Sequence, residues 1–472
     1  MSVRFSELDG ASVGVWGAGR EIGSFAAQLA RRVPSARIVV AAFDTPPAAD
    51  VRDTLRAPHA RIVTVAGSAV GDAGASADGA ASAELITALS GCDVVVRSPG
   101  VSIYRPELRA VRESGTPVTT ATALWLAEHG SGGVIGVTGT KGKSTTAALA
   151  RHLARAAGRT ARLAGNIGVP ALDLLDSEPA EVTVLELSSY HTADLDTGPE
   201  VALVTSLFRE HTDWHGSEDA YRADKLRLLG LPGVRTAVIN CRDARLREQL
   251  PAGARAGVET VRYGVPEGWD VVAEGIALGG ELRASSAELP LRGEHNALNL
   301  CGALAALEAL GIAPPLPDSL SGFQPLAHRL ETVTERDGVL WIDDSISTTP
   351  ESALAALASF PDRQLILIGG GQDRGQDYAQ LGRVLAETSA SVIGVPSTGS
   401  RLIAAARAAG VAESRAIEAP DLATAVELAR SLAPRGSVVL LSPAAPSYDS
   451  YRDFEQRGER FRELVASGMI QP

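Results

Sequence analysis

The stretch GVTGTKGKSTT, which begins at residue 136, combines the residue types of a loop that holds phosphate. It follows a short apolar run typical of a strand and opens an amphipathic helical pattern. Gly139 and Gly142 let backbone N–H groups converge on an anion at the helix N-terminus, where the helix dipole also favours negative charge. Lys143 and Ser144 then predict an ammonium that reaches terminal phosphates and a hydroxyl that ligates Mg²⁺. The alternative is a plain glycine-rich turn, because valine stands where GxxxxGK[ST] has its first glycine.

Possible metal ligands follow this loop in the chain. Glu186, in VTVLELSSYHT, ends a buried strand, so its carboxylate is expected at the edge of a sheet where α/β ligand sites form. Beside a phosphate loop such a carboxylate is a hard oxygen ligand for Mg²⁺, whereas alone it is an exposed strand end. His211, in LVTSLFREHTDWHG, follows the next strand, where a histidine is usually structural. His215 is assigned to the surface or to a second layer, and Lys225, in YRADKLRLL, has the pattern of a solvated lysine.

A second glycine loop, VGVWGAGREIG, lies near the start of the chain and contains Gly17, Ala18, Gly19 and Arg20. Its third glycine comes one residue later than GxGxxG requires. Asp44 closes the second strand, as in a Rossmann half. This pattern leaves NAD, a flavin or no ligand as alternatives.

The elements that must position these residues alternate along most of the chain. Short β-branched runs follow Ala/Leu/Arg-rich helical stretches, a pattern typical of βαβ units and largely parallel sheets. The strands fall into three series, so we predict an α/β protein with three domains. They are a Rossmann-like domain at 1–118, a central P-loop ATPase-like domain with a parallel sheet at 119–325, and a C-terminal Rossmann-like domain at 326–472.

Composition excludes several classes of protein. A chain of 472 residues with a formal net charge of −12 does not present the general excess of Lys and Arg that nucleic acid or an anionic membrane requires. The three cysteines are odd in number, far apart and without CxxC spacing, so the sequence indicates neither a disulfide framework nor a zinc knuckle. The start lacks the apolar segment of a signal peptide, and no run approaches the length of a membrane span. We therefore expect a cytoplasmic protein with no membrane insertion and no nucleic-acid partner.

The T-G-T-x-G-K-S segment after a strand resembles the ATP loop of the Mur ligase family, which also includes folylpolyglutamate synthases. The family uses ATP to join a carboxylate to an amine through an acyl phosphate. GEHNALNLCGALAALEALG resembles the segment that lines its adenine pocket, and LAHRLETV resembles the segment that carries its phosphate-clamping arginine. The resemblance implies the following ATP contacts: Gly139, Thr140, Lys141, Gly142, Lys143, Ser144, Thr145, Asn296, Asn299, Arg329 and Asp344.

The same resemblance implies two Mg²⁺ ions. Ser144 and Glu186 correspond to the ligands of the first, and His211, in an E-H-x-D segment, corresponds to a ligand of the second. Lys225 matches a lysine that the family carbamylates, which turns it into an oxygen ligand. The residues implied to carry catalysis are Lys143, His211, Lys225 and Arg329.

VVVRSPGVS contains an S-P-G turn that resembles the UDP-sugar domain of muramoyl ligases, which indicates a UDP binder rather than a redox domain. GNIGVP resembles the family segment that reaches both substrate and metal. The residues implied for the UDP substrate are Gly17, Ala18, Gly19, Arg20, Asp44, Ser98, Pro99, Gly100 and Asn166.

Within the family, ELSSYHT and LLSPAAPSYDSYRDFEQRGERF are most similar to members that add glutamate to UDP-N-acetylmuramoyl-L-alanine. The implied glutamate contacts are Thr348, Arg374, Ser447 and Phe454. Three positions depart from the usual D-glutamate enzymes: Lys141 replaces Asn, Ile346 replaces Lys and Arg374 replaces Lys. Exchanging lysine for arginine re-aims a bound carboxylate. These departures resemble a variant group that adds L-glutamate, in bacteria where a separate epimerase then makes the D-centre.

The resemblance therefore implies a monomeric ATP-dependent ligase of peptidoglycan precursor synthesis that adds L-glutamate to UDP-N-acetylmuramoyl-L-alanine. Addition of D-glutamate is the first alternative. A folylpolyglutamate-type ligase is the second, and the UDP-type glycine loop argues against it. A non-catalytic nucleotide-sugar sensor with the same fold is the third, and the complete set of phosphate and metal positions argues against it.

Overall fold

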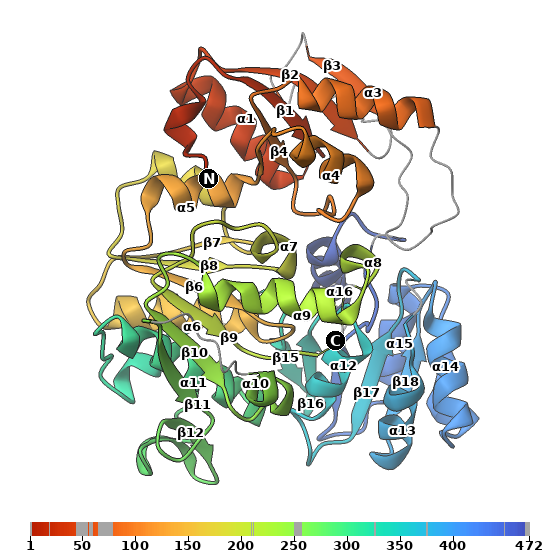
Figure 1. Cartoon of the computed structure of the whole chain (residues 1–472). Helices are drawn as coiled ribbons and strands as arrows, with labels where there is room; N and C mark the ends of the chain where they lie inside the picture. Colours follow the sequence, from red (N-terminus) through yellow and green to blue (C-terminus); the bar gives the residue numbers. More distant parts are fainter. Residues whose placement is uncertain are drawn as a thin grey trace. The chain divides into compact units, whose positions relative to one another are not determined.

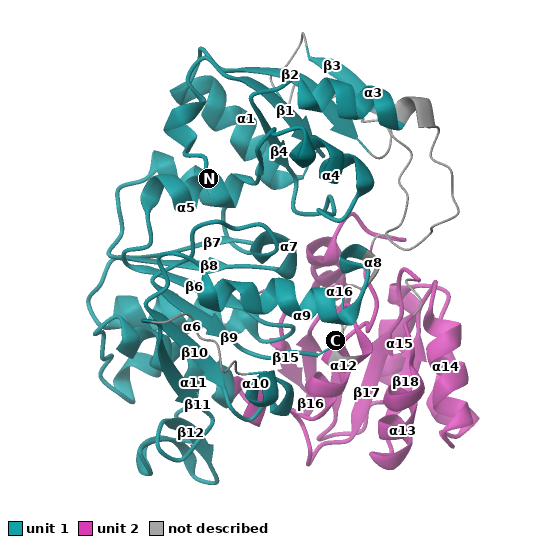
Figure 2. Ribbon diagram, in the orientation of Figure 1, with its two compact units in different colours: residues 1–290, 297–323 teal, residues 291–296, 324–472 magenta. Residues whose placement is uncertain are grey.

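The computed structural model describes residues 2–17, 19–43, 55, 60–64, 79–208, 210, 212–249, 257–324, 327–373, 376–447 and 449–467. The chain forms two compact units, shown in different colours in Figure 2. The first contains residues 1–290 and 297–323, and the second contains residues 291–296 and 324–472.

The first unit begins with a parallel sheet (Figure 1). Its strands are β1 (Ser12–Trp16), β2 (Arg37–Phe43), β3 (Arg61–Thr64), β4 (Val94–Arg97) and β5 (Val118–Thr119), and its helices are η1 (Phe5–Leu8), α1 (Arg20–Arg32), α3 (Gly79–Ser90) and α4 (Pro106–Glu113). Among the described residues the strand order is β3-β2-β1-β4-β5, and every neighbouring pair is parallel. Because the order reverses beside β1, the loop after β1 lies at the position where Rossmann folds bind ligands. The predicted Rossmann-like arrangement is confirmed.

A second parallel sheet of the first unit carries the phosphate loop. Its strands are β6 (Val134–Thr138), β7 (Ala161–Gly165), β8 (Val182–Glu186), β9 (Val201–Val204), β10 (Thr236–Asn240) and β11 (Glu259–Tyr263). The helices along this part of the chain are α5 (Ala121–His129), α6 (Lys143–Ala156), η2 (Ala171–Asp176), α7 (Ser189–Thr192), α8 (Thr212–His215), α9 (Glu218–Leu226), η3 (Arg227–Gly230) and α10 (Ala244–Gln249). The strand order is β11-β10-β9-β6-β8-β7 in the described part of the chain. β6 therefore lies between β8 and β9, so the loop after it has parallel strand ends on both sides.

A small antiparallel sheet was not predicted from the sequence. Its strands are β12 (Trp269–Val272), β13 (Gly275–Leu278) and β14 (Glu281–Ser285), and they are followed by α11 (Glu294–Ala309) and η4 (Asp318–Leu320). Gly279 and Gly280 connect β13 to β14 with φ values of +58° and +80°. Two consecutive positive φ values are the geometry of a tight hairpin turn, which this Gly-Gly pair permits.

The second unit contains a mixed sheet. Its strands are β15 (Glu331–Arg336), β16 (Val339–Asp343), β17 (Leu365–Gly369), β18 (Ser391–Gly394), β19 (Ala416–Glu418) and β20 (Val438–Leu441). Its helices are α12 (Pro350–Leu357), α13 (Ala379–Glu387), α14 (Gly399–Ala408), η5 (Glu413–Arg415), α15 (Leu422–Leu432) and α16 (Phe454–Ser467). The order is β15-β16-β20-β17-β18-β19 within the described residues, with β15 antiparallel to β16 and the other pairs parallel. The carboxyl ends of β16, β17 and β20 therefore meet at one edge.

One apolar cluster continues through both parallel sheets of the first unit. It includes Phe25 from α1, Trp125 from α5, Leu172 from η2 and Leu185 from β8, each almost fully buried. This shared core explains why the predicted domains at 1–118 and 119–325 lie in one compact unit. The three-domain boundaries themselves remain a prediction.

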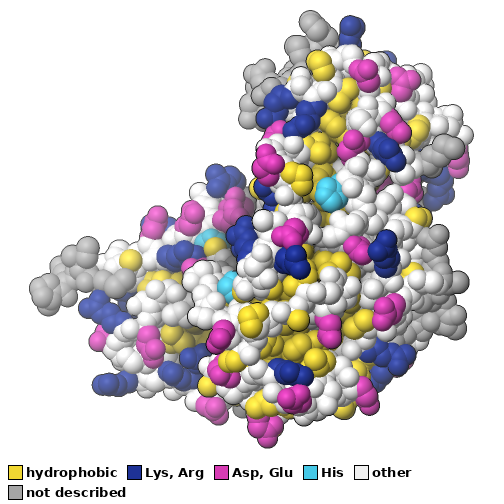
Figure 3. Space-filling view, turned by 90° about the vertical axis from the view of Figure 1, so that its left-hand side faces the viewer, with side chains coloured by type: hydrophobic (Ala, Val, Ile, Leu, Met, Phe, Trp, Pro, Cys, Tyr) yellow, Lys and Arg dark blue, Asp and Glu magenta, His cyan; other side chains and the backbone are white. Residues whose placement is uncertain are grey.

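The charged side chains and the apolar character of the helices can be compared with the composition. On the face in Figure 3, Lys and Arg side chains are interspersed with Asp and Glu side chains, and no large area has one sign of charge. None of the helices in the described ranges has both the length and the apolar character needed to cross a membrane.

Candidate active site

The phosphate loop connects the end of β6 to the start of α6 and depends on two glycines. Gly139 has φ +145° and Gly142, the residue before the helix, has φ +86°. A Cβ atom at Gly139 would lie 1.9 Å from Thr205 Oγ1, and one at Gly142 would lie 2.3 Å from Asn299 Oδ1. Glycine is therefore required at both positions. The second contact also shows that α11 brings Asn299, an implied ATP contact, against the loop.

The segment after β9 holds the loop in place. Thr140 N donates to Ser206 O at 2.8 Å, and Thr140 Oγ1 donates to Phe208 O at 3.1 Å. Lys141 N donates to Ser206 Oγ at 2.8 Å. Ser144 and Thr145 lie in the first turn of α6, both almost fully buried. The loop is thus braced from one side, which fixes the directions of its backbone N–H groups.

The two lysines of the loop have different partners. Lys141 Nζ forms an ion pair with Glu210 Oε1 at 2.8 Å. Lys143 Nζ donates to the carbonyl oxygens of Gly139 and Thr140, each at 3.0 Å. Lys143 therefore lies along the loop backbone, where a phosphate would be held, whereas Lys141 is directed to a carboxylate beside it.

Lys225 is buried beside this loop, so the alternative of a solvated lysine is wrong. Its Nζ atom donates to Gly139 O at 2.9 Å and lies 4.8 Å from the centre of the Tyr221 ring. Burial and, next, the charge of Lys143 hold the pKa of the Lys225 ammonium well below its usual range. The amine therefore loses its proton more readily than an exposed lysine.

Glu186 ends β8, directly beside β6, and is almost fully buried. Its Oε1 atom accepts a hydrogen bond from Asn166 Nδ2 at 2.9 Å. Its Oε2 atom is buried and has no hydrogen-bond partner among the described residues. A buried carboxylate oxygen without a partner is costly unless a ligand satisfies it. The donor type and the location beside the phosphate loop fit Mg²⁺, and the alternative of an exposed strand end is wrong.

Several predicted residues lie outside the described residues: Ala18, Asp44, His211 and Arg374. His215, which was assigned to the surface or to a second layer, is buried. Its ring nitrogens contact Asp224 Oδ2 at 2.6 Å and Ser189 Oγ at 2.9 Å. Both nitrogens are thus engaged inside the protein, which agrees with a supporting role.

The residues implied for the UDP substrate converge from both parallel sheets. A Cβ atom at Gly17 would lie 2.7 Å from Ser98 Cβ, so the glycine loop and the S-P-G turn are in close contact. The Arg20 guanidinium donates to Asn166 O at 3.1 Å and to Gly168 O at 3.3 Å. Because Asn166 also bonds Glu186, a continuous series of contacts joins the glycine loop to the candidate metal carboxylate.

Arg97 is a residue of this region that the sequence analysis missed. It is fully buried and pairs with both carboxylate oxygens of Asp194, at 2.9 and 2.6 Å. It also donates to Pro99 O at 3.1 Å and Val101 O at 3.0 Å, which fixes the S-P-G turn. Trp214 Nε1 donates to Gly100 O at 3.0 Å from α8. The sequence feature that could have indicated a buried arginine is its position at the end of the apolar run VVVR.

Glu21 and His191 form a second buried connection that was not predicted. Glu21 Oε1 lies 2.6 Å from His191 Nε2 and accepts from Thr122 Oγ1 at 3.1 Å. Although burial opposes it, the neighbouring His191 leads to a net lowering of the Glu21 pKa. The pair links α1 to α7, which follows the strand of Glu186.

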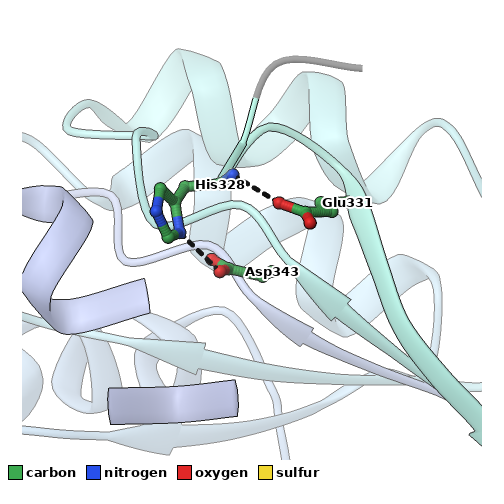
Figure 4. A group of neighbouring side chains, drawn as sticks. All are labelled: His328, Glu331 and Asp343. Carbon is green, nitrogen blue, oxygen red and sulfur yellow. Dashed lines mark hydrogen bonds and ion pairs between the residues drawn. The ribbon is translucent and has the colours of Figure 1, made fainter. Parts of the chain in front are cut away.

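In the second unit, Arg329 follows a histidine held in an unusual conformation. His328 has φ +61°, and its Nδ1 atom lies 2.7 Å from Asp343 Oδ2, while its backbone N donates to Glu331 Oε2 at 2.8 Å (Figure 4). These three side chains have the ligand types of a metal site. However, the Arg462 guanidinium donates to Asp343 Oδ2 at 3.3 Å and contacts Glu331 Oε2. Because a cation already neutralises both carboxylates, we interpret the cluster as the support of the Arg329 turn.

Arg329 and Asp344 are the implied ATP contacts next to this support. The Nε atom of Arg329 is buried without a hydrogen-bond partner in the described part of the chain, which fits a donor that awaits an anion. Asp344 is buried and accepts from Ser347 Oγ at 2.5 Å and Ser442 Oγ at 2.7 Å. Asn296, at the start of α11, donates through Nδ2 to Arg292 O at 2.7 Å.

The implied glutamate contacts in the described residues lie on two loops and at the start of one helix of the second unit. Thr348 follows β16, Ser447 follows β20, and Phe454 is the first residue of α16. Ser447 is buried, and Thr348 and Phe454 are half-buried. Since β16 and β20 are parallel neighbours, the loops after them leave the sheet at the same edge.

The buried carboxyl group of Asp344 makes the stability of the protein depend on pH. Burial raises its pKa from 3.8 to about 6, against the effect of the hydrogen bonds from Ser347 and Ser442. Between these values the folded state holds a proton that the unfolded chain has released, so the free energy of unfolding falls as the pH rises through this window. We expect urea titrations at several pH values to show that the free energy of unfolding falls less between about pH 4 and about pH 6 for Asp344→Asn than for the wild type. An identical fall in both proteins would contradict the shifted pKa.

Comparison with known proteins places these sites in a family context. Residues 137–307 match the model of the Mur ligase middle domain, and residues 328–445 match the model of the Mur ligase glutamate ligase domain. A UDP-N-acetylmuramoyl-L-alanine--L-glutamate ligase of Salinispora tropica is 42% identical over 474 residues, which cover 98% of this chain and 99% of that protein. The protein of the same name from Xanthomonas axonopodis pv. citri is 39% identical over 477 residues, 98% of this chain and 97% of its own length.

Solved structures show the same fold at low sequence identity. The MurF ligase of Thermotoga maritima in complex with ADP has a TM-score of 0.59 at 16% identity and covers 99% of both chains. The UDP-N-acetylmuramate-alanine ligase MurC of the same organism has a TM-score of 0.57 at 18% identity, with 97% of this chain and 100% of that chain covered.

Proposed function

The chain belongs to the Mur ligase family, and we propose that it is the ATP-dependent ligase that adds L-glutamate to UDP-N-acetylmuramoyl-L-alanine in peptidoglycan precursor synthesis. The observation that carries this proposal is the similarity, over nearly the whole chain, to relatives named for that activity. The geometry of the phosphate loop, and a Glu186 oxygen that has no hydrogen-bond partner among the described residues, support ATP-dependent chemistry.

The central part of the first unit is proposed to bind ATP. Gly139 and Gly142 allow the positive-φ backbone and the close packing of the loop, and the first turn of α6 would direct backbone N–H groups toward the phosphates. Lys143 leaves the loop carbonyl oxygens and pairs with the terminal phosphates of ATP. Asn299, which lies against Gly142, supplies a further contact to ATP. Arg329 is proposed as a further ATP contact, as the resemblance to the family implies.

Two Mg²⁺ ions are proposed from the donor set. Ser144 and Glu186 would hold the first, since Glu186 Oε2 is buried and has no partner among the described residues. His211 and Lys225 would hold the second, provided that the Lys225 amine is carbamylated, and the lowered pKa of this buried amine favours that modification. Magnesium would neutralise charge on the phosphoryl oxygens that are transferred.

The reaction we propose has two steps. An oxygen of the alanyl carboxylate attacks the γ-phosphorus of ATP, the bond to the β-γ bridging oxygen breaks, and ADP leaves an acyl phosphate behind. The uncharged amine of glutamate then attacks the acyl carbon, phosphate leaves, and the amine loses a proton as the amide forms. Lys143 and Arg329 stabilise the negative charge that develops on the phosphoryl oxygens, and the rigid loop keeps the reactants aligned.

The first sheet is proposed to hold the UDP part of the substrate. The glycine loop after β1 lies against the S-P-G turn, and Arg20 and Asn166 extend this surface toward Glu186. We further propose the three domains at 1–118, 119–325 and 326–472, a monomeric state and a cytoplasmic location. A separate epimerase would then convert the newly added L-centre to the D-form.

The choice of L-glutamate can be tested directly. We expect purified protein to release phosphate from ATP in the presence of UDP-N-acetylmuramoyl-L-alanine and L-glutamate, with kcat/KM at least about a hundredfold lower for D-glutamate. Omission of the UDP substrate serves as the control for ATP hydrolysis by itself. A clear preference for D-glutamate would contradict the proposed stereochemistry, and no glutamate-dependent phosphate release would support the non-catalytic sensor.

A further inference from the structure

Arg457, on the first helical turns of α16, is a buried cation in the second unit. Its side chain is only 3% exposed. Within the described residues, no carboxylate forms an ion pair with it, in contrast to Arg460 and Arg462 on the same helix. Burial lowers the pKa of the Arg457 guanidinium to about 10, so the group stays protonated near neutral pH. A charge buried in this way needs hydrogen bonds to its whole donor set.

The hydrogen bonds of Arg457 account for that donor set. Nε donates to Ser345 Oγ at 3.0 Å, and Nη2 donates to Ser345 O at 2.8 Å and Ala445 O at 3.2 Å. Nη1 donates to Ala445 O at 3.1 Å and Gly370 O at 3.5 Å. A guanidinium has about five N–H donors, and each has a partner here. Arg457 therefore has no donor left for a substrate carboxylate.

The partners of Arg457 come from three separate segments of the sheet edge. Ser345 follows β16, Gly370 follows β17 and Ala445 follows β20. Backbone bonds join the last two, because Gly370 N donates to Pro443 O at 2.8 Å and Gln372 N donates to Pro446 O at 2.8 Å. Ser345 Oγ also donates to Phe454 O at 2.8 Å, which ties the first segment to the start of α16.

Two of the three segments held by Arg457, those of Ser345 and Ala445, and the helix that carries Arg457 itself each contain one of the residues proposed to contact glutamate. Thr348 comes three positions after Ser345, Ser447 comes two positions after Ala445, and Phe454 precedes Arg457 by about one helical turn. Their relative positions therefore depend on the one guanidinium to which their segments are attached.

We propose that Arg457 is a positioning residue that sets the geometry of the glutamate site, and through it the discrimination between L- and D-glutamate. This inference rests on the function proposed above. Stereochemical choice requires two carboxylates and an amine to be held at fixed relative positions, and those positions come from different loops. Lysine cannot replace the arginine, because an ammonium is a point charge with three donors and cannot span the same partners.

The test compares Arg457→Lys with Arg460→Lys in the full-length chain. Arg460 lies on the same helix, is half exposed and pairs with Glu463 at 3.0 Å, so it is a matched control. For Arg457→Lys we expect the KM for L-glutamate to rise about tenfold and the ratio of kcat/KM between L- and D-glutamate to fall about tenfold. The KM values for ATP and the UDP substrate stay within about twofold of the wild type. Arg460→Lys leaves all of these parameters unchanged.

A second variant keeps the test decisive if Arg457→Lys does not fold. Ser345→Ala removes one hydroxyl that accepts from Arg457 and donates to Phe454 O. For this variant we expect the KM for L-glutamate to rise about threefold and the ratio of kcat/KM between L- and D-glutamate to fall about threefold. An active wild type whose variants keep the wild-type KM for glutamate and the wild-type L/D ratio would overturn the role of Arg457. A uniform loss of kcat with both values unchanged would also overturn it. A wild type without glutamate-dependent phosphate release would instead overturn the proposed function.

Discussion

Replacing Lys143 with alanine is expected to reduce glutamate-dependent phosphate release by at least about a thousandfold while UDP-substrate binding stays nearly intact. The Lys143 ammonium lies along the loop, 3.0 Å from the carbonyl oxygens of Gly139 and Thr140. From there it can turn to the terminal phosphates of ATP and offset the charge that develops during transfer. The UDP substrate is proposed to bind at the glycine loop after β1, which does not include this lysine.

The measurement pairs an assay of phosphate release with calorimetric binding of the UDP substrate. Lys141→Ala is the matched control, because this lysine belongs to the same loop but pairs with Glu210 at 2.8 Å. We expect the control to lose less than about tenfold in activity. Wild-type turnover in the Lys143 variant would refute the assignment of the phosphate lysine.

Changing Glu186 to glutamine is expected to lower kcat/KM by about a hundredfold or more and to raise the Mg²⁺ concentration needed for half-maximal activity. The amide has nearly the same shape as the carboxylate, and its oxygen can still accept the bond from Asn166 Nδ2. What the variant loses is the negative charge and the buried carboxylate oxygen that has no hydrogen-bond partner among the described residues and fits a metal ion. The thermal stability should not fall, because Glu186 forms no ion pair with any of the described residues, and a buried charge of that kind is itself costly.

Glu181→Gln provides the comparison for this variant. Glu181 lies immediately before β8, at the opposite end of the strand from Glu186, and its half-exposed side chain pairs with Arg159 at 2.7 Å. We expect the activity and the magnesium dependence of Glu181→Gln to match those of the wild type. If Glu186→Gln retained both properties as well, Glu186 would not be a metal ligand.

The phosphate loop shows what local sequence can reveal. Gly139 and Gly142 between an apolar strand and a helical pattern predicted a turn that brings backbone N–H groups together, and the structure has that turn. Glu186 was predicted at a strand end because it closes the apolar run VTVLE. The small antiparallel sheet at 269–285 escaped prediction, because its short strands of mixed polarity give a weak periodic signal.

Lys225 and Arg97 show where local sequence fails. Lys225 has charged neighbours in a helical pattern, which is typical of a solvated side chain, yet it bonds a carbonyl oxygen 86 residues earlier in the chain. Arg97 pairs with Asp194, 97 residues away. Burial of a charged side chain depends on which distant segments fold over it, and periodicity does not report that.

The sequence by itself determined the alternation of strands and helices, the phosphate loop and the resemblance to a family of ligases, because each is encoded by residues close together in the chain. Only the tertiary structure decided which oxygen of Glu186 is left without a partner among the described residues, how Lys225 and Lys143 meet at Gly139 O, and that Arg457 joins three loops. Those properties arise when groups distant in sequence share one buried environment, where each charge and each hydrogen-bond donor must find a partner or await a ligand.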